Sequence, residues 1–151
     1  MMKLTEQNIL ILGAGKIGST IADMAAELHG ATVTLADMRP PPASGDAQIQ
    51  PLQLDIQDDA ALAAALQKHT LVINALPFFC AARGAQAAAQ QGVHYFDLTE
   101  DVAAMRTIQA LAPQASSVLM PQCGLAPGLI GILRGHLAQQ FDELYDLHLR
   151  V

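Results

Sequence analysis

The sequence predicts an α/β fold of the doubly wound, Rossmann type, in which a parallel sheet carries helices on both faces. Three observations favour this class. Short apolar runs alternate with segments of helical spacing along the chain, which is typical of crossover units that build a parallel sheet. The first run, NILIL, leads directly into GAGKIG, with glycines at Gly13, Gly15 and Gly18. The next run ends at an acid, Asp37, and this order of features predicts the strand order 3-2-1-4-5-6.

In the N-terminal half, apolar runs bounded by glycine or turn residues predict buried parallel strands. These are NILIL at 8–12, TVTLA at 32–36 and IQPLQLD at 49–55. Because Pro51 cannot donate to a sheet, we expect the third strand nearer an edge. Helical spacing predicts helices over 16–30 and 58–69, the second with Asp58 and Asp59 in its first turn, where the helix dipole favours acids. Residues 37–48 contain three consecutive prolines and predict a loop.

The alternation continues in the C-terminal half. Strands are predicted at 71–75, 93–98 and 116–121, and helices at 78–92, 100–112 and 126–141. Pro127 lies near the start of the last helix, where a missing N–H costs little. The final stretch, YDLHLRV at 145–151, alternates apolar and polar residues, which predicts a half-buried strand.

Composition narrows the classes of protein. Hydrophobic residues make up 52% of the chain and charged residues 15%, so a disordered chain is excluded. The net charge of −6 argues against a nucleic-acid or anionic-membrane partner. Apolar runs fall short of the ~20 residues of a membrane span, and the N-terminus lacks a secretion signal, so we expect a cytoplasmic protein. Cys80 and Cys123 form no metal-type pair, and the histidines show no HExxH spacing, so no metal site is predicted.

The glycine turn has the spacing of a phosphate cradle. Gly13 would permit the tight turn, Gly15 would let the backbone approach a pyrophosphate, and Gly18 would let helix and strand pack closely. The free N–H groups and the dipole of the following helix would hold the anion. The alternative is a glycine turn that merely packs well.

The acid after the second strand bears on the choice of cofactor. Asp37 can accept both ribose hydroxyls of NAD and repel a 2′-phosphate, so we expect NAD. Arg39, two residues on, could instead accommodate the phosphate of NADP, which stays the alternative. Asp55, at the end of the third strand, would meet the adenine edge or cap the next helix. Ala75 would let the backbone approach the cofactor, and Pro77 would stiffen the loop.

Together, MPQCGLAPGL at 120–129, LVINALPFF at 71–79 and GVHYFDLTED at 92–101 resemble the saccharopine dehydrogenase-like family. That family includes saccharopine reductases, lysine 6-dehydrogenase and carboxynorspermidine dehydrogenase-type enzymes. The resemblance runs over nearly the whole chain. It implies hydride transfer between a nicotinamide and the carbon–nitrogen bond of an amino acid or polyamine.

The resemblance also implies roles for residues. The pyrophosphate turn would consist of Gly13, Gly15, Lys16, Ile17 and Gly18. Asp37 would be the acid that binds the ribose, and Asp55 and Ile56 would lie near the adenine. Ala75, Leu76 and Pro77 would form the wall near the nicotinamide ribose, and Cys123 and Gly124 would lie on the nicotinamide side. Several saccharopine reductases read Gly-Leu-Asp-Pro-Gly where this chain has GLAPG. Because Ala126 replaces that acid, a lysine 6-dehydrogenase-like enzyme is favoured.

The family further implies a second, α+β domain. We therefore expect residues 1–141 to form the dinucleotide-binding domain. Residues 142–151 would be the first strand of a truncated substrate-binding and dimerisation domain, and the full-length protein would be a homo-oligomer. Catalytic residues would then lie beyond this sequence, and the chain alone would be inactive.

The chemistry of single residues also bears on other functions. Cys123 could be a nucleophile if a helix N-terminus lowered its pKa, but a packing role is favoured. His94 is expected to pack within its strand, and Phe78 and Phe79 to pack on the following helix. A short-chain dehydrogenase needs a Tyr with a Lys four residues later, and neither tyrosine has one. A non-catalytic NAD-sensing regulatory module remains the alternative to an enzyme.

Overall fold

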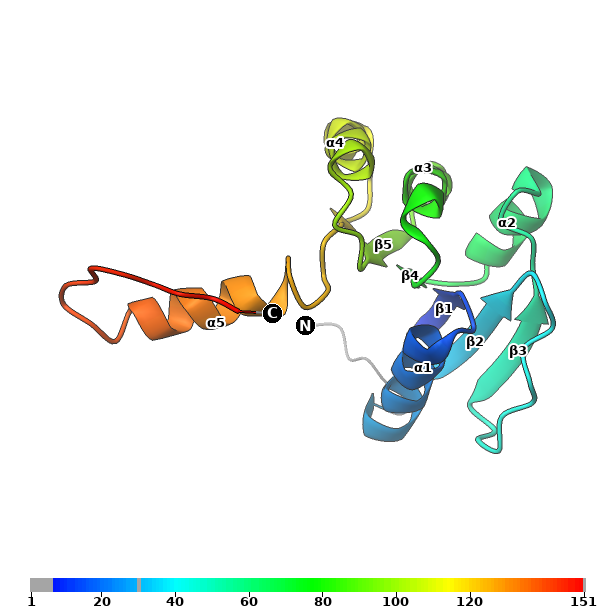
Figure 1. Cartoon of the computed structure of the whole chain (residues 1–151). Coiled ribbons are helices and arrows are strands. Elements are labelled where there is room, and N and C mark those ends of the chain that lie inside the picture. The colour runs from blue at the N-terminus through cyan, green and yellow to red at the C-terminus, as the bar shows by residue number, and fades with distance from the viewer. Residues whose placement is uncertain (1–6, 30, 151) are drawn as a thin grey trace.

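The fold is a six-stranded parallel sheet of order β3-β2-β1-β4-β5-β6, which confirms the predicted class and strand order. A computed structural model describes residues 7–29 and 31–150 (Figure 1). The strands are β1 (Asn8–Leu12), β2 (Thr32–Asp37), β3 (Ile49–Gln53), β4 (Leu71–Asn74), β5 (His94–Asp97) and β6 (Leu119–Met120).

Within the described residues, four helices connect successive strands and a fifth follows β6, while a loop joins β2 to β3. The helices are α1 (Lys16–His29), α2 (Asp59–Leu66), α3 (Ala81–Gln91), α4 (Val102–Leu111) and α5 (Leu129–Ala138), with short 3₁₀ turns η2 (Phe78–Cys80) and η3 (Ala112–Gln114). Figure 1 shows α1 on one face of the sheet and α2, α3 and α4 on the other. Gly30, the predicted end of the first helix, lies outside the described residues.

Two apolar layers hold the helices to the sheet. Consecutive strand residues point to opposite faces, so Ile9 and Ile11 pack with the α1 layer while Leu10 and Leu12 pack with α2 and α3. All four side chains are buried. Burying each one contributes about 1.5–3 kcal/mol, so β1 anchors both layers and fixes the position of the turn that follows it.

A proline lies in one edge strand of the sheet and directly after the other. β3 is an edge strand, as Pro51 predicted. β6 is much shorter than the predicted 116–121. It ends at Met120 because Pro121 lacks an N–H and Gln122 adopts a positive φ of 65°. The chain therefore leaves the sheet immediately after Met120 and enters a loop beside the end of β5.

The predicted strand at 145–151 is not formed by residues 145–150, and Val151 lies outside the described residues. Alternation of apolar and polar residues sets the faces of a strand, but a strand also needs a hydrogen-bonded neighbour. Within the described residues no strand pairs with this segment, and Tyr145 is 87% exposed. Figure 1 shows α5 extending away from the sheet and the following residues running back alongside that helix. The division into domains at residue 141 stays a prediction.

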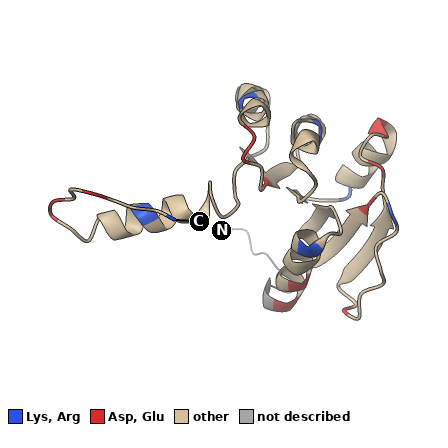
Figure 2. Ribbon diagram, viewed as in Figure 1, with Lys and Arg blue, Asp and Glu red and all other residues tan. Residues whose placement is uncertain are grey.

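Charged residues lie mainly on helices and loops, as Figure 2 shows, while the strands carry few. The described part of the chain has no helix long and apolar enough to cross a membrane. Over the same residues, no group of His, Cys, Asp and Glu side chains has the arrangement of a metal site.

Candidate dinucleotide site

The three glycines of the first turn differ in what surrounds them. Gly13 has a φ of +103°, in the region that favours glycine, and its N–H donates to the Ala36 carbonyl at 2.7 Å. A Cβ on Gly18 would lie 1.8 Å from the Gly13 carbonyl oxygen. A Cβ on Gly15 would meet no atom within 4 Å. The turn therefore needs Gly13 for its conformation and Gly18 for packing, whereas Gly15 leaves open space in front of the backbone.

That open space lies at the N-terminus of α1. The first intrahelical amide is that of Ser19, which donates to the Gly15 carbonyl at 2.9 Å. The N–H groups of Lys16, Ile17 and Gly18 precede it and have no acceptor within the helix, as in any first helical turn. Unpaired donors, a positive dipole end and uncovered backbone together fit an anion such as a pyrophosphate.

Asp37 joins the glycine turn to the end of β2. Its Oδ2 accepts a hydrogen bond from the Ala14 N–H at 2.9 Å, and its Oδ1 accepts from the Arg39 N–H at 3.1 Å. The carboxylate is thus fixed beside the turn by two backbone donors. A cavity of 380 Å³, here called the turn cavity, lies beside it. The turn cavity is lined by Ala14, Gly15, Asp37, Arg39, Pro40, Pro41 and Pro42.

A second cavity, of 580 Å³, lies beyond the ends of β2 and β3 and is here called the β2–β3 cavity. Its lining includes six of the predicted cofactor residues: Asp37, Arg39, Asp55, Ile56, Leu76 and Pro77. Met38, Gln57, Phe79 and Cys80, which were not predicted as site residues, line the same cavity. Met38 and Gln57 directly follow predicted site residues, so the strand-end rule would have found them.

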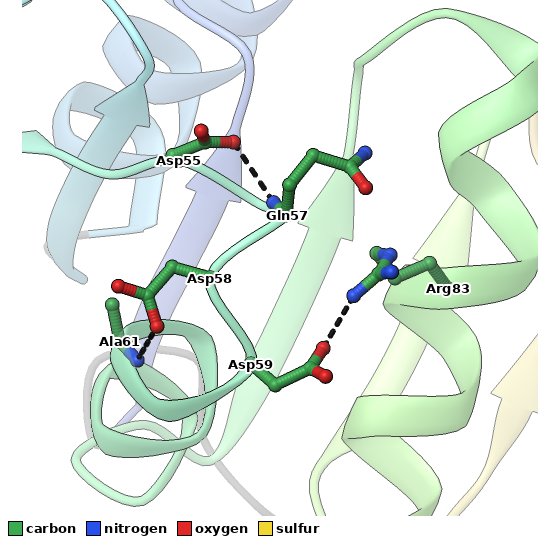
Figure 3. A network of polar contacts seen from close by, with 6 residues as sticks. All are labelled: Asp55, Gln57, Asp58, Asp59, Ala61 and Arg83. Atoms are coloured by element: carbon green, nitrogen blue, oxygen red, sulfur yellow. Dashed lines mark hydrogen bonds and ion pairs between the residues drawn. The ribbon is translucent and has the colours of Figure 1, made fainter.

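Asp55 does not cap the next helix, so that alternative is wrong. Its Oδ1 accepts from the Gln57 N–H at 2.8 Å in a tight turn, as Figure 3 shows. The cap of α2 is Asp58, whose Oδ1 accepts from the Ala61 N–H at 3.0 Å. Asp59, in the first turn of α2, pairs instead with Arg83 of α3 (Figure 3). Asp55 is exposed and its second oxygen, Oδ2, is left for a ligand of the β2–β3 cavity.

A third cavity, of 700 Å³, lies beyond the ends of β4 and β5 and is here called the β4–β5 cavity. It is lined by Ile17, Ala75, Leu76, Phe78, Leu98, Thr99, Glu100, Asp101 and Val102. Of these, Ile17, Ala75 and Leu76 were predicted from the sequence as site residues. The missed stretch 98–102 follows β5 directly, and the rule that ligands bind at strand C-termini could have found it.

The two phenylalanines do not pack as expected. Phe78 and Phe79 are 59% and 71% exposed, and their rings contact each other edge to face at 5.6 Å between centroids. Each lines one of the strand-end cavities. By contrast, the His94 side chain is hydrogen-bonded next to its strand, as predicted: its Nδ1 accepts from the Val118 N–H at 3.1 Å.

Cys123 and Gly124 line none of the three cavities. The Cys123 Sγ lies 3.3 Å from the Met120 carbonyl, to which it donates. Burial, with the charge of Asp97 adding to it, raises the pKa of the Cys123 thiol, so the structure gives no support to a thiolate nucleophile. A Cβ on Gly124 would lie 3.3 Å from the Leu98 carbonyl, which makes this glycine a packing residue.

Residues 9–120 match the family model described as the saccharopine dehydrogenase NADP binding domain. Two curated relatives carry the name saccharopine dehydrogenase [NADP(+), L-glutamate-forming]. The one from Pyricularia oryzae is 29% identical over 130 residues, which cover 83% of this chain and 29% of the relative. The one from Schizosaccharomyces pombe is 26% identical over 126 residues, which cover 81% of this chain and 28% of the relative. The chain thus spans less than a third of the length of these relatives.

Solved structures support the fold. An apo saccharopine dehydrogenase (L-Glu forming) from Saccharomyces cerevisiae matches with a TM-score of 0.77 and 22% identity, covering 89% of this chain and 31% of that one. A structure of MoeE5 in complex with UDP-glucuronic acid and NAD matches with a TM-score of 0.60 and 20% identity, covering 76% of this chain and 53% of that one.

Proposed function

Because the chain belongs to the saccharopine dehydrogenase family through its NADP-binding domain, we propose that it is the cofactor-binding part of an oxidoreductase. The enzyme would transfer hydride between a nicotinamide dinucleotide and the carbon–nitrogen bond of an amino acid. The observation that carries the proposal is the open backbone at Gly15 in front of the unpaired amides of α1. Both strand-end cavities open on either side of that point, as a dinucleotide requires.

The chain's own residues would divide the cofactor between the two cavities. The amides of Lys16, Ile17 and Gly18 would bind the pyrophosphate. Asp37 and Asp55 would orient the adenosine half in the β2–β3 cavity. The nicotinamide half, which carries the hydride, would then lie in the β4–β5 cavity, beside Ala75 and Leu76.

For the cofactor, we propose that the chain binds both NADP and NAD. The names of the family and its relatives specify NADP, and Arg39 beside the turn cavity offers a cation for a 2′-phosphate. Asp37 acts in the opposite direction, because its fixed carboxylate favours the ribose hydroxyls of NAD. The two residues should offset each other, leaving the two affinities within about tenfold, or about 1.4 kcal/mol.

Calorimetric titration of the purified protein tests this balance. Asp37→Ser should shift the preference toward NADP, and Arg39→Gln should weaken NADP while leaving NAD unchanged. Arg106→Gln removes the same charge from the exposed face of α4 and is the matched control. Unmodified protein that prefers either cofactor by more than about a hundredfold would contradict the proposal.

The substrate proposal needs the full-length enzyme. The relatives' names favour saccharopine, whereas Ala126 favours lysine as substrate. Absorbance of the reduced cofactor should rise when full-length enzyme is mixed with oxidised cofactor and one of these amino acids. Purified protein of 151 residues should bind cofactor without turnover, because reaction also needs a substrate held ~3–3.5 Å from the nicotinamide. Full-length protein that binds cofactor but oxidises neither amino acid would instead favour a sensing module.

A further inference from the structure

A buried chain of hydrogen bonds runs beneath the β4–β5 cavity, from the end of β4 to the end of β5. Asn74, Tyr95 and Asp97 are 2%, 0% and 1% exposed. Asn74 accepts from the Leu76 N–H at 3.1 Å and donates through Nδ2 to the Tyr95 hydroxyl at 3.0 Å. That hydroxyl lies 2.9 Å from the Asp97 Oδ2 and 3.0 Å from the Ala81 carbonyl oxygen, the two acceptors within its reach. Burial raises the pKa of Tyr95 far above its ordinary value, so the hydroxyl keeps its proton as a donor.

Asp97 continues this chain into the loop after β6. Its Oδ1 accepts from the N–H groups of Thr99 and Gln122, each at 3.0 Å, and its backbone carbonyl accepts from the Cys123 N–H at 2.8 Å. Gln122 has a φ of 65°, a backbone conformation that residues other than glycine rarely adopt. The bonds from Asp97 therefore hold a turn that its own sequence disfavours.

This chain of hydrogen bonds joins two segments that are far apart in sequence. On one side it ends at Leu76, and on the other at Thr99, Gln122 and Cys123. Leu76 and Thr99 both line the β4–β5 cavity. Gly84 of α3 leaves room for it, because a Cβ there would lie 3.3 Å from a Tyr95 ring carbon and 3.5 Å from the Asn74 amide nitrogen. A hydrophobic core needs no such polar residues, and each adds a group that must stay paired.

We propose that Asp97, acting through Tyr95 and Asn74, is a positioning residue that sets the spacing between the two walls of the nicotinamide half of the site. The inference rests on the proposed function, because it needs the nicotinamide in the β4–β5 cavity. The adenosine half is bound by other residues, around Asp37 and the glycine turn. Loosening the buried chain should therefore weaken the hold on nicotinamide and leave the hold on adenosine unchanged.

The test compares two ligands on the purified protein, NADH and ADP-ribose, which lacks the nicotinamide. Tyr95→Phe cuts the link between the walls without changing the ring, and Asp97→Asn removes the charge that holds the loop. We expect the Kd for NADH to rise about tenfold, as for loss of one buried partner, and the Kd for ADP-ribose to stay within about twofold. Matched controls are Tyr145→Phe and Asp58→Asn, which make the same changes outside the network.

The ratio of the two Kd values is the readout. Both ligands bind only folded protein, so partial unfolding of a variant cancels from this ratio. A ratio that rises in Tyr95→Phe and Asp97→Asn but not in the controls supports the inference. A ratio that stays constant, with both ligands bound by the unmodified protein, overturns the inference and leaves the proposed function standing. Unmodified protein that binds neither ligand overturns both.

Discussion

Gly15→Val and Gly18→Ala both change the glycine turn, but we expect different effects. Gly18→Ala should destabilise the fold, whereas Gly15→Val should weaken cofactor binding. At Gly18 a Cβ would lie 1.8 Å from the Gly13 carbonyl oxygen, and the atom it meets is backbone that cannot swing aside. Overpacking of this kind costs about 1–3 kcal/mol or more, against a gain of about 1 kcal/mol in helix propensity. We expect a net loss of ~2 kcal/mol, which lowers Tm by about 4–8 °C in a chain of this size.

At Gly15 the added side chain would project into open space, so the fold should tolerate valine. The same space is where the pyrophosphate must approach the amides of α1. Hydrogen bonds to a charged group contribute about 1.5–3 kcal/mol each, so losing two costs ~3–6 kcal/mol. Affinity for NADH should fall by at least about a hundredfold, while Tm changes by less than about 2 °C.

Differential scanning calorimetry measures the first effect and titration calorimetry with NADH the second. Gly45→Val is the control for both, since Gly45 lies in the loop before β3 and its Cβ would also meet nothing within 4 Å. If Gly15→Val binds NADH as tightly as the unmodified protein, the turn is not the pyrophosphate site. If Gly18→Ala is as stable as the unmodified protein, the packing argument fails.

Three further outcomes are expected. Burial raises the pKa of the Cys80 and Cys123 thiols above their ordinary 9.0, and it also raises the pKa of the Tyr95 hydroxyl. A group whose pKa is higher in the folded protein than in the unfolded protein contributes its full stability below the unfolded-state pKa. That contribution is lost as the pH rises through the folded-state pKa. The free energy of unfolding in urea should therefore hold steady up to about pH 9 and fall above it. Alkylation of Cys123 by iodoacetamide at pH 8 should be slower than that of a free thiol; faster alkylation would revive the nucleophile hypothesis. Asp58→Ala removes the cap that accepts from Ala61 and should cost ~1 kcal/mol by urea unfolding, with cofactor affinity unchanged.

The proximity of the glycine turn and Asp37 could be predicted from the sequence because it depends on local chain order. A strand, a glycine turn, a helix and a strand-end acid place Gly15 and Asp37 next to each other in any parallel sheet of this order. The structure confirms that proximity through the bond from Ala14 to Asp37. Pro51 likewise predicted that its strand lies at an edge of the sheet, because a residue without an N–H cannot donate a hydrogen bond to a neighbouring strand.

The sequence by itself determined the order of elements, the polarity of each strand face and the glycine turn, since these follow from short-range sterics and periodicity. Tertiary structure alone decided three things. It left residues 145–150 without a strand, because pairing needs a neighbour. It placed the Gln122 amide on the Asp97 carboxylate, which holds the turn after β6. It also joined Asn74, Tyr95 and Asp97, which lie on two strands, into one buried chain. Hydrogen bonds between residues far apart in sequence depend on register and packing, which no local pattern encodes.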